Sequence, residues 1–233
     1  MLDSLFLSFR EGLEAALIIG IILITLTRLG RNHLYRAVVS GTIAGVVGSV
    51  VLGFILFQFA QSISHEAEEI LEVSMMLVAS GLIAYFILWL HRNQHVTTEL
   101  KEQVAKTQSR IGLFLLAFLS VAREGIELVI FNLTKVTEAA STVVLGSLIG
   151  IIASIFIAIL LFKTTIKLNL GLIFKALGLI LILIGGEMFA EGIIELISVE
   201  TEVIEIGLMA LFIIPSFYIL FKNDLSKWMK ANT

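Results

Sequence analysis

Seven long apolar stretches constrain this chain more than any other feature of its sequence. A bilayer core about 30 Å thick is crossed by a helix of about 20 apolar residues, and each stretch is close to that length. Only 15% of the residues are charged, against about 25% in a typical soluble domain. The sequence therefore predicts an all-α membrane protein with seven transmembrane helices. They run roughly over Leu2–Thr27, Ala37–Phe59, Ile70–Leu90, Ile111–Leu133, Thr142–Phe162, Leu170–Ala190 and Ile206–Phe221.

The loops between these helices predict the orientation of the chain. Thirteen of the sixteen basic residues fall in alternate loops, at their edges or at the C-terminal end. Because positive loops stay on the cytoplasmic side, we expect the N-terminus outside, the C-terminus in the cytoplasm and a multi-pass location in the cell membrane. The opposite loops are acidic. Their charge is either ordinary solvated loop charge or a field that concentrates cations at an entrance.

A pentapeptide pattern, Arg-Glu-Gly-x-Glu, occurs twice, once from Arg10 to Glu14 and again 113 residues later from Arg123 to Glu127. The repetition indicates that the first three helices and the next three are copies of one unit. Three helices are an odd number, so the second copy is inverted, as in many transporters.

We therefore expect a single membrane domain built from two inverted three-helix repeats and a seventh helix. Repeat 1 covers about 1–91, a cytoplasmic loop about 92–110, repeat 2 about 111–197 and the seventh helix about 203–222. Val96, Leu100 and Val104 recur at four-residue spacing within the loop, which predicts a short surface helix. Pro215 is the only proline, and we expect it to kink or break the seventh helix unless packing compensates.

The charges of the two motifs point to function, because each one costs about 2.5–3.5 kcal/mol at the centre of a membrane. Carboxylates three residues apart project from one helix face. The motif glutamates are Glu11, Glu14, Glu124 and Glu127. Together they predict an oxygen cage for a hard cation, with Arg10 and Arg123 balancing its charge. A structural alternative is that each arginine merely neutralises the glutamate four residues on, but this leaves Glu11 and Glu124 unexplained.

The side chains that could act as metal ligands limit which ions the protein could transport. The chain has no cysteine, and its four histidines lie at helix edges or in loops. Oxygen ligands suit Fe(III), Mg, Ca and Mn. A net charge of −3 without a basic surface gives no indication of nucleic acid binding.

A second acidic set lies near the expected outer ends of the third and sixth helices. Glu69 and Glu72 are three residues apart, while Glu187 and Glu191 are four apart and continue to Glu195. We predict a loading site for cations from Glu69, Glu72, Glu187 and Glu191. The alternative is that these are solvated helix ends without a role.

The doubled motif resembles that of the iron permease family, which includes fungal oxidase-coupled permeases and bacterial iron-uptake permeases. Ile166–Lys175 resembles the start of that family's sixth helix, and Glu69–Glu72 with Trp89 resembles its third helix. Glu72-Val73 departs from the usual Glu-Gly. The resemblance implies that Glu11, Glu14, Glu124 and Glu127 handle iron.

We therefore expect an iron permease that imports iron, not an enzyme, with iron as the transported substrate and no cofactor. The expected partners are iron ions, membrane lipid, and an extracytoplasmic ferroxidase or iron-delivery protein, and homo-oligomer formation is left open. One alternative is transport of another cation such as manganese or lead. A membrane di-iron carboxylate enzyme is less favoured, because such sites use Glu-x-x-His pairs and the sequence has none.

Overall fold

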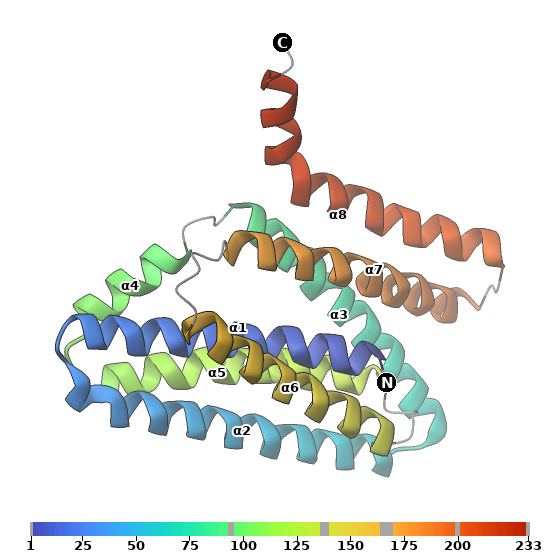
Figure 1. The fold of residues 1–233 in the computed structure, drawn as a ribbon. Coiled ribbons are helices and arrows are strands. Elements are labelled where there is room, and N and C mark those ends of the chain that lie inside the picture. Colours follow the sequence, from blue (N-terminus) through green and yellow to red (C-terminus); the bar gives the residue numbers. More distant parts are fainter. Residues whose placement is uncertain (1, 93–95, 136–139, 164–169, 199–200, 232–233) are drawn as a thin grey trace. The chain divides into compact units, whose positions relative to one another are not determined.

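A computed structural model gives the fold and describes residues 2–92, 96–135, 140–163, 170–198 and 201–231. The described residues are almost entirely helical, which confirms the all-α prediction (Figure 1). The helices are α1 (Leu2–Arg28), the short 3-10 helix η1 (Asn32–Leu34), α2 (Tyr35–Ser62), α3 (His65–Arg92), α4 (Val96–Lys106), α5 (Arg110–Leu133), α6 (Ala140–Lys163), α7 (Leu170–Ile197) and α8 (Glu202–Ala231).

Five segments of the described chain are long and apolar enough to cross a membrane. They are Asn32–Ser62, Glu69–Leu88, Ser141–Lys163, Lys175–Ile197 and Glu202–Lys222. The helices α1 and α5 are also long, with 27 and 24 residues, but each carries three motif charges in its interior. The same charges that suggest a function therefore set these two helices apart from the apolar five.

The short helix α4 is the surface helix expected from the spacing of Val96, Leu100 and Val104. It has 11 residues, too few to span a bilayer. Val104 is completely buried in an apolar cluster, against which Leu100 also packs. That cluster consists of Ile22, Leu26, Leu34, Val38, Val104, Leu113 and Ala117. It joins α4 to the end of α1 and to the beginnings of α2 and α5.

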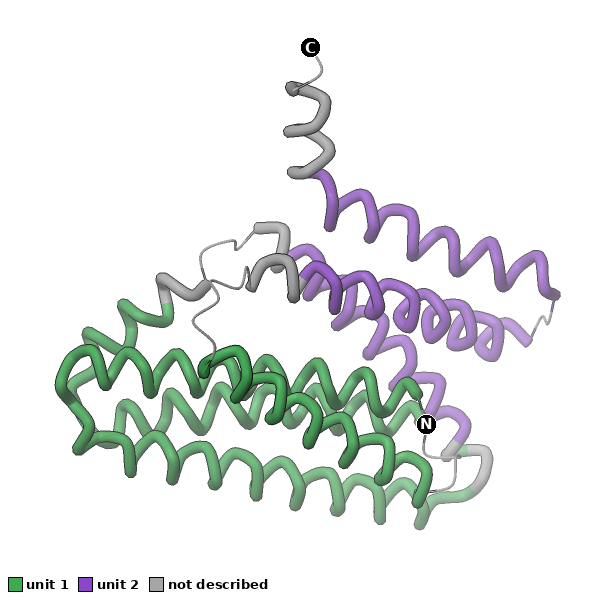
Figure 2. The backbone as a smooth tube through the Cα atoms, in the orientation of Figure 1, with its two compact units in different colours: residues 1–68, 95–168 green, residues 69–94, 169–233 purple. Residues whose placement is uncertain are grey.

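The chain divides into two compact units, shown in different colours in Figure 2. Unit 1 comprises residues 1–68 and 95–168, and unit 2 comprises residues 69–94 and 169–233. The first two long helices of each predicted repeat, α1 with α2 and α5 with α6, belong to unit 1. The third helices, α3 and α7, belong to unit 2 together with α8. The division therefore cuts across the predicted repeat boundaries.

Within unit 1, α1 packs along α6 through small residues. A side chain at Gly12 would meet Ser154, and one at Gly20 would meet the ring of Phe162. From Gly12 to Gly20 the chain advances eight residues along α1, and the contacted residue advances from Ser154 to Phe162, also eight residues, along α6. The two helices therefore run parallel. Gly150 of α6 lies against the backbone of Leu5, as expected where glycine lets membrane helices approach closely.

The helices α5 and α2 form a second pair with the same design. Gly45 of α2 lies against Val121 and the backbone of Phe118, and Gly53 lies against Val129. Again the two partners advance by eight residues together, so α2 and α5 are also parallel. Unit 1 is therefore built from two parallel helix pairs, each combining helices from both halves of the chain.

The proline in α8 does not break that helix, which continues from Glu202 to Ala231 with Pro215 inside it. The turn before the proline packs closely on α7, where Gly185 lies against Phe212 and Gly186 lies against Ile213. Neighbouring helices are known to compensate for proline in this way. The helix is therefore continuous through Pro215, as the sequence allowed if packing compensates for the proline.

Candidate metal-ion site

The first motif lies in the interior of α1, well away from either helix end. Its i,i+3 spacing places the carboxylates of Glu11 and Glu14 near each other on the helix surface. Arg10, Glu11 and Glu14 are all buried, and the side chain of Arg10 is only 2% exposed. Three buried charges on one helix demand partners nearby, because an isolated ion in a low-dielectric interior is strongly disfavoured.

The second motif lies on α5, which runs antiparallel to α1. Near the start of α1, Asp3 Oδ2 lies 2.9 Å from Nζ of Lys135, just beyond the end of α5. Further along, Arg10 Nη1 lies 3.8 Å from Glu127 Oε2. These contacts fix the register in which the two motifs face each other.

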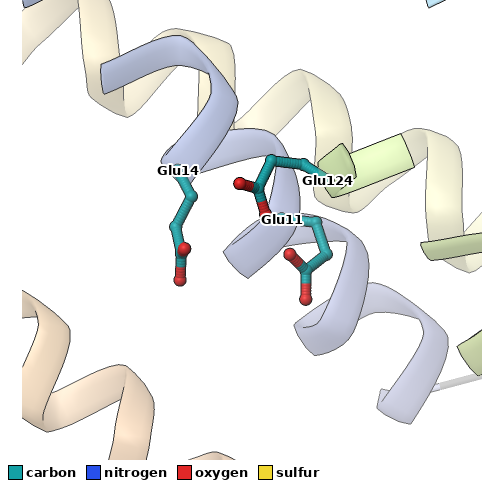
Figure 3. A group of neighbouring side chains, drawn as sticks. All are labelled: Glu11, Glu14 and Glu124. Carbon is teal, nitrogen blue, oxygen red and sulfur yellow. The ribbon is translucent and has the colours of Figure 1, made fainter. Parts of the chain in front are cut away.

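Three of the four motif carboxylates form a tight cluster. Glu11, Glu14 and Glu124 each offer an oxygen, and these oxygens lie within 4.8 Å of one another. Figure 3 shows two of the side chains leaving α1 and the third leaving α5. All three are buried. Oxygens grouped in this way could hold a hard cation.

Three oxygens of the cluster have no hydrogen bond among the described residues. They are Oε2 of Glu11, Oε1 of Glu14 and Oε2 of Glu124. Oε1 of Glu14 has Nη2 of Arg10 as an ion-pair partner at 2.8 Å. Buried polar atoms are normally hydrogen-bonded, so the oxygens of Glu11 and Glu124 require an explanation. A bound cation or water would satisfy both of them.

The two arginines contact the cluster differently. Arg10 pairs with Glu11, with Glu14 at 2.8 Å and with Glu127 at 3.8 Å. Arg123 lies 3.0 Å from Glu127 and 4.0 Å from Glu124. Glu127 therefore stands between the two guanidinium groups and links the two motifs.

The motif glycines allow the neighbouring helices to approach the cluster. A side chain at Gly12 would collide with Ser154 of α6, and one at Gly125 would collide with Ser49 of α2. The two serines were not among the residues singled out from the sequence. A second internal repeat could have revealed them, since Gly41, Gly45 and Ser49 have the same spacing as Gly146, Gly150 and Ser154.

The second acidic set lies in the other unit. Glu69 and Glu72 are on α3, and Glu187 and Glu191 are on α7, so all four belong to unit 2. Glu69, Glu187 and Glu191 are exposed, and Glu72 is half-buried. Ile166–Asn169, part of the segment that resembles the family's sixth helix, lies outside the described residues.

The described helices include membrane-spanning candidates, and two facing helices carry buried carboxylates. These features are typical of a cation transporter. Comparison with known proteins makes the assignment specific, because residues 1–231 match the iron permease FTR1 family. The chain belongs to this family. Its members are transporters, in agreement with the expectation of transport rather than catalysis.

Several relatives are just over a quarter identical to this chain across the residues that align. An uncharacterized protein of Archaeoglobus fulgidus is 28% identical over 202 residues, which cover 87% of this chain and 72% of the relative. The ferrous iron permease EfeU of Escherichia coli O6:H1 is 27% identical over 191 residues, covering 79% of this chain and 69% of the relative. The Yersinia pestis EfeU is 27% identical over 192 residues, covering 79% and 68%. No solved structure matches this chain.

Proposed function

We propose that this protein imports iron through a site made by Glu11, Glu14, Glu124 and Glu127. The observation that carries the proposal is the buried cluster of three carboxylates, drawn from two antiparallel helices, with oxygens within 4.8 Å of one another. Burying like charges together is unfavourable unless a cation neutralises them. A protein that keeps such a cluster inside a membrane gains from it a binding site for cations in transit.

An inverted-repeat architecture with seven transmembrane helices is part of the proposal, and equivalent contacts in unit 1 support it. Positions 113 residues apart on α1 and α5 meet equivalent glycines. Gly150 faces the backbone of Leu5 and the side chain of Ser8, while Gly45 faces the backbone of Phe118 and the side chain of Val121. These contacts are what a two-fold relation between α1–α6 and α5–α2 predicts.

The seven proposed spans are the five apolar segments together with α1 and α5. Broad faces of α2 and α6 expose large apolar side chains, including Val50, Phe54, Ile152 and Phe156, as lipid-facing helices do. We infer from the basic loops that the N-terminus lies outside and the C-terminus inside.

The orientation has a direct test, because the chain contains no native cysteine. We expect Ser64→Cys to react with an impermeant thiol reagent added outside cells, and Thr107→Cys to react only after the cells are opened. The opposite pattern would overturn the proposed import direction.

Further parts of the proposal concern cargo and loading. The relatives named ferrous iron permease favour Fe2+, with manganese and lead as alternatives. We propose that Glu69, Glu72, Glu187 and Glu191 attract cations from outside before transport. Family resemblance suggests an extracytoplasmic ferroxidase or iron-delivery protein as a partner.

The decisive experiment is Fe2+ uptake into liposomes containing the purified protein, under anaerobic and reducing conditions. The wild type should transport Fe2+, and excess Mn2+ or Pb2+ in parallel assays would define selectivity. Glu11→Gln and Glu124→Gln should each abolish uptake. Glu102→Gln is the control, because Glu102 is an exposed residue of α4 paired with Lys106. Uptake at the wild-type rate by the Glu11→Gln/Glu124→Gln double variant would refute the proposed site.

A further inference from the structure

The two arginines occupy equivalent positions in the two motifs but have different surroundings. The side chain of Arg10 is 2% exposed and that of Arg123 is 52% exposed. Arg10 reaches carboxylates of both motifs, since it pairs with Glu11 and Glu14 on its own helix and with Glu127 on α5. Among the residues that the structure describes, Arg123 forms ion pairs only with Glu124 and Glu127, the carboxylates of its own motif.

Arg10 therefore lies where a transported cation would make its own contacts. Its guanidinium is within ion-pair distance of Glu11 and Glu14, two of the three glutamates that form the carboxylate cluster. A cation held by these oxygens and a guanidinium on the same oxygens would repel each other at close range in a low-dielectric interior. Both cannot remain fully bound there.

We propose that Arg10 is a tethered competitor for the transported cation: its guanidinium neutralises the empty carboxylate cluster, and a cation binds only as Arg10 withdraws. The inference rests on the proposed transport function and assigns unequal roles to two residues that the sequence makes look identical. Arg123 remains a peripheral counterion of Glu127 throughout.

The contacts of Glu127 provide a way for Arg10 to leave. Its Oε1 accepts a hydrogen bond from Nε of Arg123 at 3.0 Å, whereas its Oε2 is the atom 3.8 Å from Arg10. Glu127 therefore keeps a cationic partner when the longer contact is lost. Withdrawal of Arg10 exposes Glu11 and Glu14 to the incoming cation without leaving Glu127 unpaired.

Competition changes the expected consequence of removing the arginine. A simple structural ion pair would be needed for folding, and its loss would weaken metal binding. A competitor lowers the apparent affinity by the fraction of molecules in which the site is free. We therefore expect Arg10→Gln to bind Fe2+ more tightly than the wild type, by about tenfold if Arg10 fills the site in about nine molecules of ten.

The test measures Fe2+ binding and thermal unfolding on the purified, full-length protein under anaerobic conditions. Without metal, Arg10→Gln should unfold at a lower temperature than the wild type, because Glu11 and Glu14 lose their counterion. Saturating Fe2+ should restore the unfolding temperature, giving a larger metal-induced shift than in the wild type. Maximal uptake should fall, because Arg10 no longer helps to displace the bound cation.

Arg123→Gln is the matched comparison, since it removes the same charge from the equivalent position. It should not tighten Fe2+ binding. Arg10→Lys, which retains a competing cation, should bind Fe2+ with nearly the wild-type affinity. If Arg10→Gln does not fold without metal, the double variant Arg10→Gln/Glu14→Gln replaces it, because the two changes together leave the net charge of the site unchanged. The double variant should fold, and Fe2+ should raise its unfolding temperature by less than that of Arg10→Gln.

Three results would overturn the proposal: weaker or unchanged Fe2+ binding by Arg10→Gln, no rescue of its unfolding temperature by Fe2+, or equal tightening by Arg123→Gln. These outcomes are distinct from failure of the proposed function. If the wild-type protein neither binds nor transports Fe2+, the transport assignment itself is wrong.

Discussion

The two halves of unit 1 use the same packing around different side chains. The pair α1–α6 and the pair α5–α2 place glycine against equivalent positions, and both bring a serine to the glycine of the motif. Yet Arg10 is buried where Arg123 is half exposed. Packing of the backbone is thus preserved between the halves, while the charges have diverged in their surroundings.

A similar difference separates the helix turns that precede the two motifs. On α1 these turns contain Ser4 and Ser8, whose buried hydroxyl oxygens have no hydrogen-bond partner among the described residues. The equivalent positions on α5 are Ala117 and Val121, both buried and apolar. Ala117 belongs to the apolar cluster around Val104. The carboxylate cluster is therefore approached through polar side chains along α1 and through apolar ones along α5.

The largest effect that tests this comparison should come from the last glutamate of each motif. We expect Glu14→Gln and Glu127→Gln to reduce Fe2+ uptake by about 100-fold or more, since a loss of about 3 kcal/mol corresponds to that factor. The measurement is initial uptake rate in liposomes at equal protein content. A substantial loss in only one of the two variants would show that a single motif carries the cation.

The next largest effect concerns the motif glycines. A methyl group at Gly12 would collide mainly with the hydroxyl of Ser154, whose Cβ is 3.2 Å away, whereas one at Gly125 would collide with both Oγ and Cβ of Ser49. Overpacking of this kind costs about 1–3 kcal/mol. Gly125→Ala should therefore lower the unfolding temperature more than Gly12→Ala.

Second-site variants sharpen this prediction. Ser154→Ala should rescue much of the stability lost in Gly12→Ala, because it removes the colliding hydroxyl. Ser49→Ala should not rescue Gly125→Ala, since the β-carbon remains, but Ser49→Gly should. Equal rescue by alanine at both sites would mean that the two helix contacts are equivalent after all.

A smaller effect is expected from the serines that precede the first motif. Ser8→Ala removes one buried hydroxyl without adding volume, so unfolding should change little. We expect uptake to fall by about two- to tenfold, which corresponds to the loss of one hydrogen bond to a hydrated cation on its way to the cluster. Val121→Ala is the matched variant on α5 and should lower stability without a selective loss of uptake. Full uptake by Ser8→Ala would show that the polar side chains along α1 do not assist cations on their way to the carboxylate cluster.

The smallest effect should come from the ion pair between Asp3 and Lys135, which joins the ends of α1 and α5. Both side chains are partly exposed, and pairs of this kind contribute about 0.2–1 kcal/mol. Asp3→Asn should lower the unfolding temperature slightly at low salt, and the difference should vanish at high salt because the charges are screened. Persistence of the difference in concentrated salt would point to a structural role beyond charge.

The sequence predicted the elements of this fold better than their assembly. Helix lengths follow from the apolar stretches, and the surface helix α4 follows from the spacing of Val96, Leu100 and Val104. The assignment of α3 and α7 to a different unit from the other helices of their repeats was not predicted, because the choice of partner depends on how small residues fit between helices. The matching pattern from Gly41 to Ser49 and from Gly146 to Ser154 is the sequence signal for the close contacts of α2 with α5 and of α6 with α1.

The candidate site was predictable in composition but not in detail. The doubled motif indicated which side chains would meet, and the structure brings Glu11, Glu14 and Glu124 together. Their role in metal binding stays a prediction. Identical motifs could not distinguish the burial of Arg10 from the exposure of Arg123, since that difference depends on the surrounding chain.

The pairing of helices from opposite halves of the chain imposes a delay during biosynthesis. Arg123 follows Arg10 by 113 residues, so at about 5–20 residues per second the second motif is made roughly 6–23 s after the first. During this interval the charges of α1 have no partner on α5. Arg10 and Glu14 lie on the same helix, 2.8 Å apart, so each can neutralise the charge of the other as soon as α1 has formed. The residue that we propose as the counterion of the empty site would thus also neutralise a charge on its own helix before α5 is made.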